Sequence, residues 1–239
     1  MEDWKYDPAH DLGLPMKQRL RSLKRESGLI ESIARLGWRA FIRTYLTLWH
    51  RLSVTGREHL PAEPPFVLIC NHTSHLDAIT LAAAMPASMR DRVLPLAAGD
   101  TFFETPLLSA FAAGLMNALP MWRHNCGRHA LKELRERLIE EPCGYILFPE
   151  GTRSRDGTLL PFKPGLGMIV AGTAAKVVPC HLGGAHRAWP PGKRMPRPYK
   201  LRLRIGEPML FDSVENRREG WEQIATQARA AVESLAPKA

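Results

Sequence analysis

The fold class follows from one stretch of sequence, which reads Phe66-Val67-Leu68-Ile69-Cys70-Asn71-His72-Thr73-Ser74-His75-Leu76-Asp77. Its first five residues are apolar and follow two prolines, a pattern that is typical of a short buried β-strand. Residues 76–85 then have the composition of a helix that ends before Pro86. A buried strand that leads directly into a helix is the unit from which α/β proteins with parallel sheets are built.

The same alternation continues along the chain. We expect an α/β fold with a mixed, largely parallel sheet flanked by helices, and an N-terminal basic amphipathic helical segment. Residues 200–205 alternate basic and apolar side chains, which predicts a half-exposed edge strand with its cations on one face. The other expected strands are 93–98, 145–148 and 177–182, and the other expected helices are 127–140, 165–175 and 214–235. We divide the chain into residues 1–52, 53–212 (the main domain) and 213–239 (a C-terminal helix).

The uncharged residues 105–122 contain two prolines, a glycine and an asparagine. A buried core helix flanked by turns is therefore favoured over a membrane span. The four cysteines (Cys70, Cys126, Cys143 and Cys180) form no C-x-x-C pair, and no secretory signal precedes them. This pattern predicts no metal site and reduced core thiols in a cytosolic protein.

The charge of the chain is unusual and unevenly spread. Its 239 residues include 33 Lys and Arg against 24 Asp and Glu, a net charge of +9. Residues 15–52 carry nine basic and two acidic residues, and residues 157–206 carry nine basic and no acidic ones. Such an excess indicates a phosphate-rich partner, either nucleic acid or an anionic membrane surface. No nucleic-acid-binding motif is present, which leaves the membrane surface as the expected partner.

The first basic segment has helical periodicity. Glu31, Arg35, Arg39 and Arg43 recur every four residues and form a narrow polar stripe between wide apolar surfaces. Two arrangements remain open. The helix either lies in the headgroup region of a membrane with this cationic edge, or it packs on the core of its own domain with its arginines facing water.

Two polar segments follow predicted buried strands. After 66–70, His72 and Asp77 could form a general base and the carboxylate that orients it, because imidazole titrates near neutral pH. Alternatively, Ser74 and Asp77 match a helix-capping pattern, and Asp77 would then only cap the helix. His75 is interpreted as a surface residue at the start of that helix. After 145–148, the segment 148–154 (Phe-Pro-Glu-Gly-Thr-Arg-Ser) offers a turn, a hydroxyl and an arginine for a phosphate.

In this order and spacing, the segments resemble the glycerolipid acyltransferase family. Asn71-His72-x4-Asp77 matches its N-H-x4-D motif, residues 148–154 match its F-P-E-G-T-R-S block, and residues 162–165 are similar to the F-K-x-G that follows. Arg123 falls where the family's second block has an arginine. The resemblance covers roughly residues 53–210.

This resemblance implies an O-acyltransferase of phospholipid biosynthesis, with a lysophospholipid acceptor such as 1-acylglycerol-3-phosphate. It implies His72 as the general base and Asp77 as its partner. The implied acceptor-binding residues are Arg123, Glu150, Gly151, Thr152 and Arg153. Since a carboxylate repels phosphate, Glu150 is expected to contact a hydroxyl or to form a structural link to an arginine.

The acyl donor implied by the resemblance is acyl-CoA or acyl carrier protein, as a co-substrate without further cofactor. The expected location is the cytoplasmic side of a membrane, peripheral or monotopic. Two departures from the family pattern are present. Met121-Trp122 precede Arg123, and residues 97–100 (Ala-Ala-Gly-Asp) lack a lysine that the family often has there, so one phosphate-directed cation is missing. The acceptor could thus be another lysolipid, and a His–Asp hydrolase of lipid esters is the alternative reaction.

Overall fold

The computed structural model describes residues 29–89, 91–98, 105, 111–121 and 128–237. Within them, one sheet has the strand order β1-β7-β6-β2-β5-β3-β4. All neighbouring strands are parallel except the antiparallel pair β6–β7. The predicted mixed, largely parallel sheet is therefore confirmed. The strands are β1 (Ser53–Thr55), β2 (Phe66–Cys70), β3 (Val93–Ala98), β4 (Leu119–Met121), β5 (Gly144–Leu147), β6 (Lys176–Gly183) and β7 (Arg202–Ile205).

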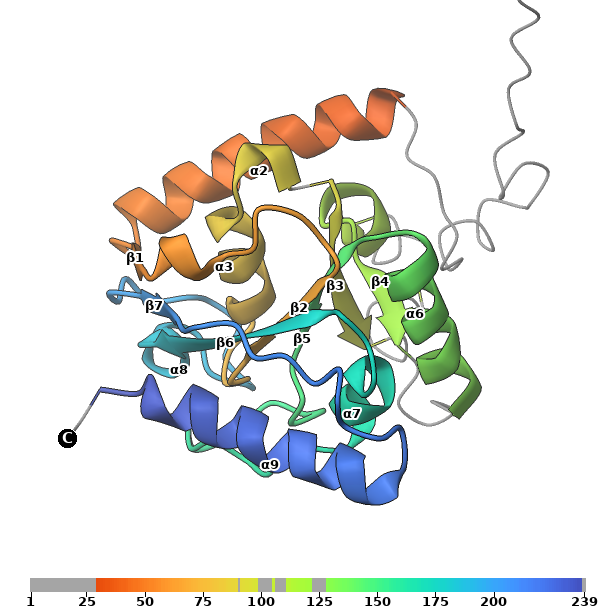
Figure 1. Cartoon of the computed structure of the whole chain (residues 1–239). Helices are drawn as coiled ribbons and strands as arrows, with labels where there is room; N and C mark the ends of the chain where they lie inside the picture. The colour runs from red at the N-terminus through yellow and green to blue at the C-terminus, as the bar shows by residue number, and fades with distance from the viewer. Residues whose placement is uncertain (1–28, 90, 99–104, 106–110, 122–127, 238–239) are drawn as a thin grey trace, which may run out of the picture.

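Helices cover both faces of this sheet, and the buried strand β2 serves both cores (Figure 1). Phe66 and Leu68 pack into a cluster with α2 (Leu29–Leu48) and α3 (Asp77–Ala84). Val67 and Ile69 point the other way, into a cluster with α6 (Arg128–Glu140), α7 (Gly165–Val170) and α9 (Arg218–Ser234). Alternation along one strand thus holds the three layers together. The short helices are η1 (Arg57–His59), η2 (Ala87–Met89), η3 (Phe111–Leu115) and α8 (Ala185–Ala188).

Two expected elements differ in kind from the structure, and the helix expected over 165–175 ends at Val170. Strand β7 is not an edge strand, because β1 pairs with its outer side. Its cationic face is as expected: Leu203 and Ile205 are buried while Arg202 is exposed. The expected helix over 105–122 is not formed by the described residues there, which contain the π-helical turn η3 and the strand β4. Pro120 is tolerated in β4 because that strand is the last in the sheet.

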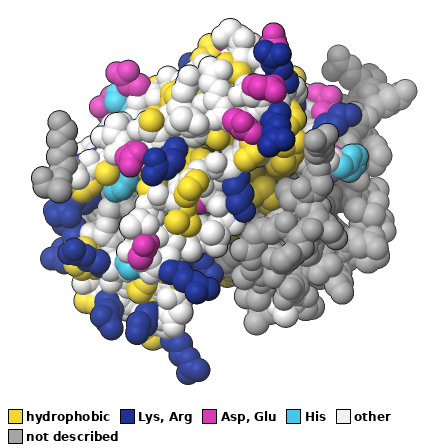
Figure 2. All heavy atoms as spheres, turned by 90° about the horizontal axis from the view of Figure 1, so that it is seen from below, with side chains coloured by type: hydrophobic (Ala, Val, Ile, Leu, Met, Phe, Trp, Pro, Cys, Tyr) yellow, Lys and Arg dark blue, Asp and Glu magenta, His cyan; other side chains and the backbone are white. Residues whose placement is uncertain are grey.

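Three of the four cysteines lie in the described residues. Cys70, Cys143 and Cys180 are buried free thiols, as predicted, and Cys126 lies outside the described residues. None of the helices in the described ranges is long and apolar enough to cross a membrane. Figure 2, which views the molecule from the side of α9, shows Lys and Arg side chains gathered toward its lower left.

Helix α2 packs on the domain through the side that carries its arginines. The guanidinium of Arg35 is buried, and its Nε donates a hydrogen bond of 3.0 Å to the carbonyl of Gly114. Arg39 forms an ion pair of 2.9 Å with Asp91, whose carboxylate also lies 3.7 Å from Arg35. Arg35 therefore faces neither water nor a headgroup, contrary to both arrangements, whereas Arg39 remains 18% exposed. The packing of α2 on the core of its own domain, which the second arrangement required, is confirmed. Arg43 is exposed, as both expectations required.

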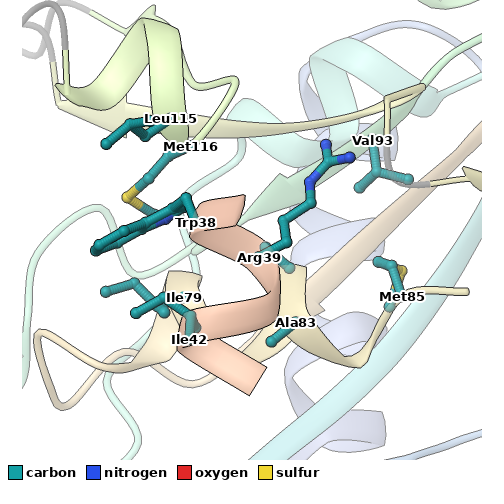
Figure 3. A pocket seen from close by; sticks show the side chains of 10 residues that line it. Trp38, Arg39, Ile42, Ile79, Ala83, Met85, Val93, Leu115 and Met116 are labelled. Carbon is teal, nitrogen blue, oxygen red and sulfur yellow. The ribbon is translucent and has the colours of Figure 1, made fainter. Parts of the chain in front are cut away.

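Apolar contacts flank these polar ones. Figure 3 shows a cavity of about 30 Å³ where α2 meets α3 and η3, with Trp38 and Ile42 of α2 opposite Ile79 of α3. Leu46 of α2 is completely buried. One side of α2 is thus part of the core.

The opposite side of α2 is apolar and exposed. Ile33, Leu36, Phe41 and Leu48 are between 60% and 75% exposed, and Trp49, just beyond the helix, is 50% exposed. We call these five residues the outer face of α2. Gly37, Ala40 and Thr44 lie among them at helical spacing, and the exposed Arg43, seven residues after Leu36, borders this surface. An exposed apolar surface of this kind marks an interaction with a protein or a membrane.

Candidate active site

The candidate site lies where the parallel strands end. In the register of the sheet, Ile69 of β2 is level with Leu147 of β5, and Cys70 is level with Cys180 of β6. The segments that follow β2 and β5 therefore emerge side by side, and they are the two polar segments that the sequence singled out. The carboxyl edge of a parallel sheet is where α/β proteins place their binding sites.

His72 and Asp77 form the expected pair. The Nδ1 atom of His72 lies 2.9 Å from Oδ2 of Asp77, and the carboxylate is completely buried while the imidazole is 23% exposed. Because an ionised carboxylate only accepts hydrogen bonds, Nδ1 of His72 is the donor in this pair, and Nε2 is the ring nitrogen left for another partner. The ring also stacks on Phe148, at 4.2 Å between ring centres and 20° between planes. Hydrogen bonding and stacking together fix the orientation of the imidazole.

The capping alternative for Asp77 is also partly realised. Its Oδ2 accepts hydrogen bonds from the backbone N–H groups of Thr73 (2.7 Å) and Ser74 (2.8 Å), which form the turn before α3. The same oxygen atom therefore orders this turn and holds His72. The Ser74 hydroxyl makes other contacts: it donates to the carbonyl of Trp189 and accepts from the N–H of Leu76. The two interpretations are not exclusive, because the turn and the imidazole share one acceptor.

Glu150 supports the His72 segment from β5. Its Oε1 accepts the backbone N–H of His72 at 2.6 Å, and its Oε2 accepts the N–H of Leu160 at 3.0 Å. Burial raises the pKa of Glu150, and these two hydrogen bonds oppose that increase. The expected link to an arginine is therefore wrong: both oxygens bind backbone groups. Nothing in the sequence signalled that Glu150 would position His72, since backbone partners leave no pattern.

A cavity of about 610 Å³ opens beside His72. Its lining is mostly apolar and comes from β3, β4, β5, η3, α6 and α7, and it includes Leu96, Ala112, Met121, Leu131, Leu147, Met168 and Ile169. The polar part of the lining contains His72, His75, Thr152, Arg153, Arg155 and Lys163. An apolar cavity with cations on one part of its wall matches a molecule that has a hydrocarbon chain and an anionic head.

The turn after β5 brings Lys163 into this cavity. Gly151 has φ +69°, and a Cβ atom built on it would lie 2.8 Å from Nζ of Lys163. Glycine adopts this φ without strain, and its lack of a side chain leaves room for the Lys163 ammonium group against the turn. Lys163 was not among the expected site residues, although it belongs to the F-K-x-G block that the sequence shows. Residues 97–100 lack the lysine that the family often has there, and Ala97 of that segment lines the cavity without a charge. Lys163 places a cation at the same cavity.

His75 lies in the cavity wall and not on the outer surface, so the expectation for it is wrong. The Nη1 atom of Arg153 lies 2.6 Å from Nδ1 of His75, and the imidazole ring is 4.9 Å from that of Trp189. Burial lowers the pKa of His75, and the charge of Arg153 lowers it further. His75 is thereby kept neutral and places the Arg153 guanidinium. Arg123 lies outside the described residues.

Fold and site together define an α/β protein with a histidine–aspartate pair at the carboxyl edge of a parallel sheet, beside an apolar cavity with a cationic wall. The model of a family described as Acyltransferase matches residues 51–183. The chain belongs to this family.

Relatives with assigned names point in the same direction. The chain is 32% identical over 147 residues to 1-acyl-sn-glycerol-3-phosphate acyltransferase BAT2, chloroplastic, of Brassica napus, covering 60% of this chain and 40% of that protein. It is 30% identical over 163 residues to a 1-acyl-sn-glycerol-3-phosphate acyltransferase of Limnanthes douglasii, covering 67% of this chain and 55% of that protein. The chain thus spans about half the length of the curated relatives it matches.

A solved structure has the same fold over most of the chain. The crystal structure of the 1-acyl-sn-glycerophosphate (LPA) acyltransferase PlsC of Thermotoga maritima superposes with a TM-score of 0.64 at 25% identity. The match covers 87% of this chain and 82% of that one.

Proposed function

We propose that the chain is an O-acyltransferase that moves a fatty acyl group from an acyl thioester to a hydroxyl group of a lysophospholipid. The proposed acceptor is 1-acylglycerol-3-phosphate, and the proposed donor is acyl-CoA or acyl carrier protein, with no further cofactor. The observation that carries the proposal is the His72–Asp77 pair, whose imidazole lines an apolar cavity with Arg153, Arg155 and Lys163 in its wall. The names of the relatives support the choice of acceptor.

The geometry supports a direct transfer. Nε2 of His72 takes the proton of the acceptor hydroxyl, and the resulting alkoxide oxygen attacks the carbonyl carbon of the thioester. The new C–O bond replaces the C–S bond, and the leaving thiolate takes the proton back from the imidazolium. Asp77 stabilises that imidazolium through the 2.9 Å hydrogen bond. No acyl group is attached to the protein in this sequence of steps.

Two parts of the cavity lining are proposed to hold the two parts of the acceptor. The hydrocarbon chain would occupy the apolar lining, and the phosphate would bind the cations that Arg153 and Lys163 supply. Thr152 and the backbone of Gly151 lie at the same wall and are proposed to contact the headgroup. Arg123 is proposed to contribute a further cation. Glu150 acts on His72 and not on the phosphate, so it is a positioning residue.

A panel of acceptors tests this proposal. Thiol release from a long-chain acyl-CoA would be followed with lysophosphatidate, lysophosphatidylcholine, glycerol 3-phosphate, or no acceptor. We expect release to depend on a lysolipid and to be fastest with lysophosphatidate. Equal release without any acceptor would show a hydrolase, and a preference for lysophosphatidylcholine would show a different acceptor. Comparing the rates of thiol release from acyl-CoA and from acyl carrier protein that carries the same acyl chain identifies the donor.

Membrane binding is proposed to use the outer face of α2. Its five apolar side chains face away from the core on a helix that the core holds rigidly. On this contact, we propose a peripheral or monotopic enzyme on the cytoplasmic side of a membrane.

Replacing Phe41 and Leu48 by serine is therefore expected to weaken membrane binding. Each fully buried apolar side chain contributes about 1.5–3 kcal/mol, so the double variant should lower the vesicle partition coefficient by roughly 100-fold or more. Co-sedimentation with vesicles of phosphatidylcholine and phosphatidylglycerol measures this coefficient. The matched control replaces Ile139 and Leu210, which are 52% and 51% exposed elsewhere on the surface. Equal losses in both double variants would rule out α2 as the membrane contact.

A further inference from the structure

A second cavity lies on the other side of the His72 segment. Its volume is about 560 Å³, and it lies among the ends of β6 and β7 and the loop after β5. Alternate residues of one segment line the two cavities: His72 and Ser74 line the first, whereas Asn71 and Thr73 line the second. Asn71 fixes this arrangement because its amide group exchanges two hydrogen bonds with the backbone of Leu182, at 2.8 and 3.2 Å.

The wall of the second cavity is strongly basic. It contains His181, His186, Arg187, Arg202 and Arg204, together with the phenol ring of Tyr199. Arg202 and Arg204 are two residues apart on β7, which places both on one face and about 7 Å apart. These residues belong to the 157–206 segment, which has no acidic residue.

Neutral groups hold two of these arginines in place and leave their charge uncompensated. Arg187 donates to the hydroxyl of Tyr199 at 2.8 Å, and its guanidinium carbon lies 5.7 Å from the centre of that ring. Arg204 donates to the carbonyl of Leu235 at 2.8 Å. In the part of the chain that the structure describes, none of Arg187, Arg202 and Arg204 forms an ion pair with a carboxylate.

The wall also contains one acid, Asp156. Its carboxylate accepts hydrogen bonds from the side chains of Ser154 and Thr158, and the backbone and hydroxyl of Thr158 with Ser154 lower its pKa to about 2. Asp156 is therefore ionised at neutral pH. His181 stands opposite Arg204 in the β6–β7 register, and burial and that arginine lower its pKa. The wall thus holds three arginines against one carboxylate, an excess of positive charge.

We propose that the second cavity binds phosphate groups. On the acyl transfer proposed above, on which this assignment rests, they are the phosphates of CoA. The acceptor carries one phosphate, for which Arg153 and Lys163 already stand in the first cavity. The nucleotide part of CoA carries a diphosphate and a further phosphate, separated from the thioester by the long pantetheine arm. Two cavities on opposite sides of the His72 segment provide places for both ends of such a donor.

The test compares two double variants that each lose two positive charges. Arg187→Gln with Arg202→Gln alters the cavity, and Lys176→Gln with Arg218→Gln alters exposed sites elsewhere. Titration calorimetry with CoA is expected to show a dissociation constant raised roughly tenfold or more in the cavity variant, and within about twofold of wild type in the control. Pantetheine, which lacks the nucleotide, should bind all three proteins alike. The KM for acyl-CoA should rise with the dissociation constant, and the KM for lysophosphatidate should not.

Each result separates this inference from the proposed function. If the cavity variant loses binding of pyrophosphate or lysophosphatidate but keeps its affinity for CoA, the cavity is a phosphate site for another ligand, and its assignment to CoA is overturned. Unchanged binding of every phosphate compound in the cavity variant overturns the inference while acyl transfer stands. If the cavity variant transfers acyl groups more slowly from acyl carrier protein but not from CoA, the inference is also overturned. If wild type releases no thiol from any donor but CoA binding still needs the arginines, the proposed function fails and the phosphate site stands.

Discussion

The His72→Ala variant is expected to lose between about 100-fold and 10,000-fold in kcat/KM for thiol release, the range that general acid–base catalysis contributes. His72 lines the first cavity, and Asp77 and Phe148 hold its imidazole ring in one orientation. Alanine removes both the base that takes the hydroxyl proton and the acid that returns it to the thiolate. The measurement is thiol release with lysophosphatidate at saturating acyl-CoA.

Controls distinguish this loss from misfolding. Because His72 is only 23% exposed and is hydrogen-bonded to the buried Asp77, its replacement should lower the midpoint of urea unfolding but leave the protein folded in the absence of urea. His129→Ala, at a histidine 85% exposed on α6, supplies a matched substitution that should retain full activity. Activity within tenfold of wild type in a folded His72→Ala protein would contradict the mechanism. In that case the transfer would need a different base.

Asp77→Asn is expected to separate the two tasks of this carboxylate. The amide oxygen can still accept the N–H groups of Thr73 and Ser74, so the turn before α3 should keep most of its stability. The amide cannot stabilise an imidazolium, and it also disturbs which nitrogen of His72 carries the proton. We therefore expect a loss of roughly 100-fold to 10,000-fold in kcat/KM with a small change in the free energy of unfolding.

Asp77→Ala provides the comparison. It leaves the two buried N–H groups without an acceptor, at about 1–3 kcal/mol each, so the free energy of unfolding should fall by about 2–6 kcal/mol. Urea titrations of the two variants measure this difference. If Asp77 only ordered the turn, the Asp77→Asn protein would keep its activity while the alanine variant lost stability. That outcome would remove the carboxylate from the proposed mechanism.

The sequence predicted most of what depends on strong local patterns. The apolar run of β2 and the polar segment after it placed His72 and Asp77 together, because five residues of chain can bring them into contact only through a tight turn. Strand β1 was missed because three residues, Ser53–Thr55, are too few for any periodicity. Its pairing with β7 also made the predicted edge strand an inner one.

Other features depend on tertiary contacts that leave no local pattern. The stripe through Arg35 and Arg39 looks like a solvated helix face, and only the positions of Asp91 and Gly114 explain why it is turned inward. Glu150 reads as part of a headgroup-binding block, yet its partners are the N–H groups of His72 and Leu160. Lys163 is twelve residues from Gly151 along the chain, and its backbone N–H donates to the carbonyl of Pro149 at 2.9 Å, which brings its side chain to the turn.

The attachment of α2 has a mechanical consequence. Arg35 joins α2 to η3 through Gly114, and Ala112 and Met116, in and next to η3, belong to the wall of the catalytic cavity. A helix anchored by a buried guanidinium and an ion pair to Asp91 cannot roll about its axis without breaking both. On the proposed membrane contact, bilayer and cavity wall would therefore keep a constant angle and spacing. A lysolipid diffusing in the plane of the membrane would always reach His72 by a route of the same length, set by the fold and not by chance orientation.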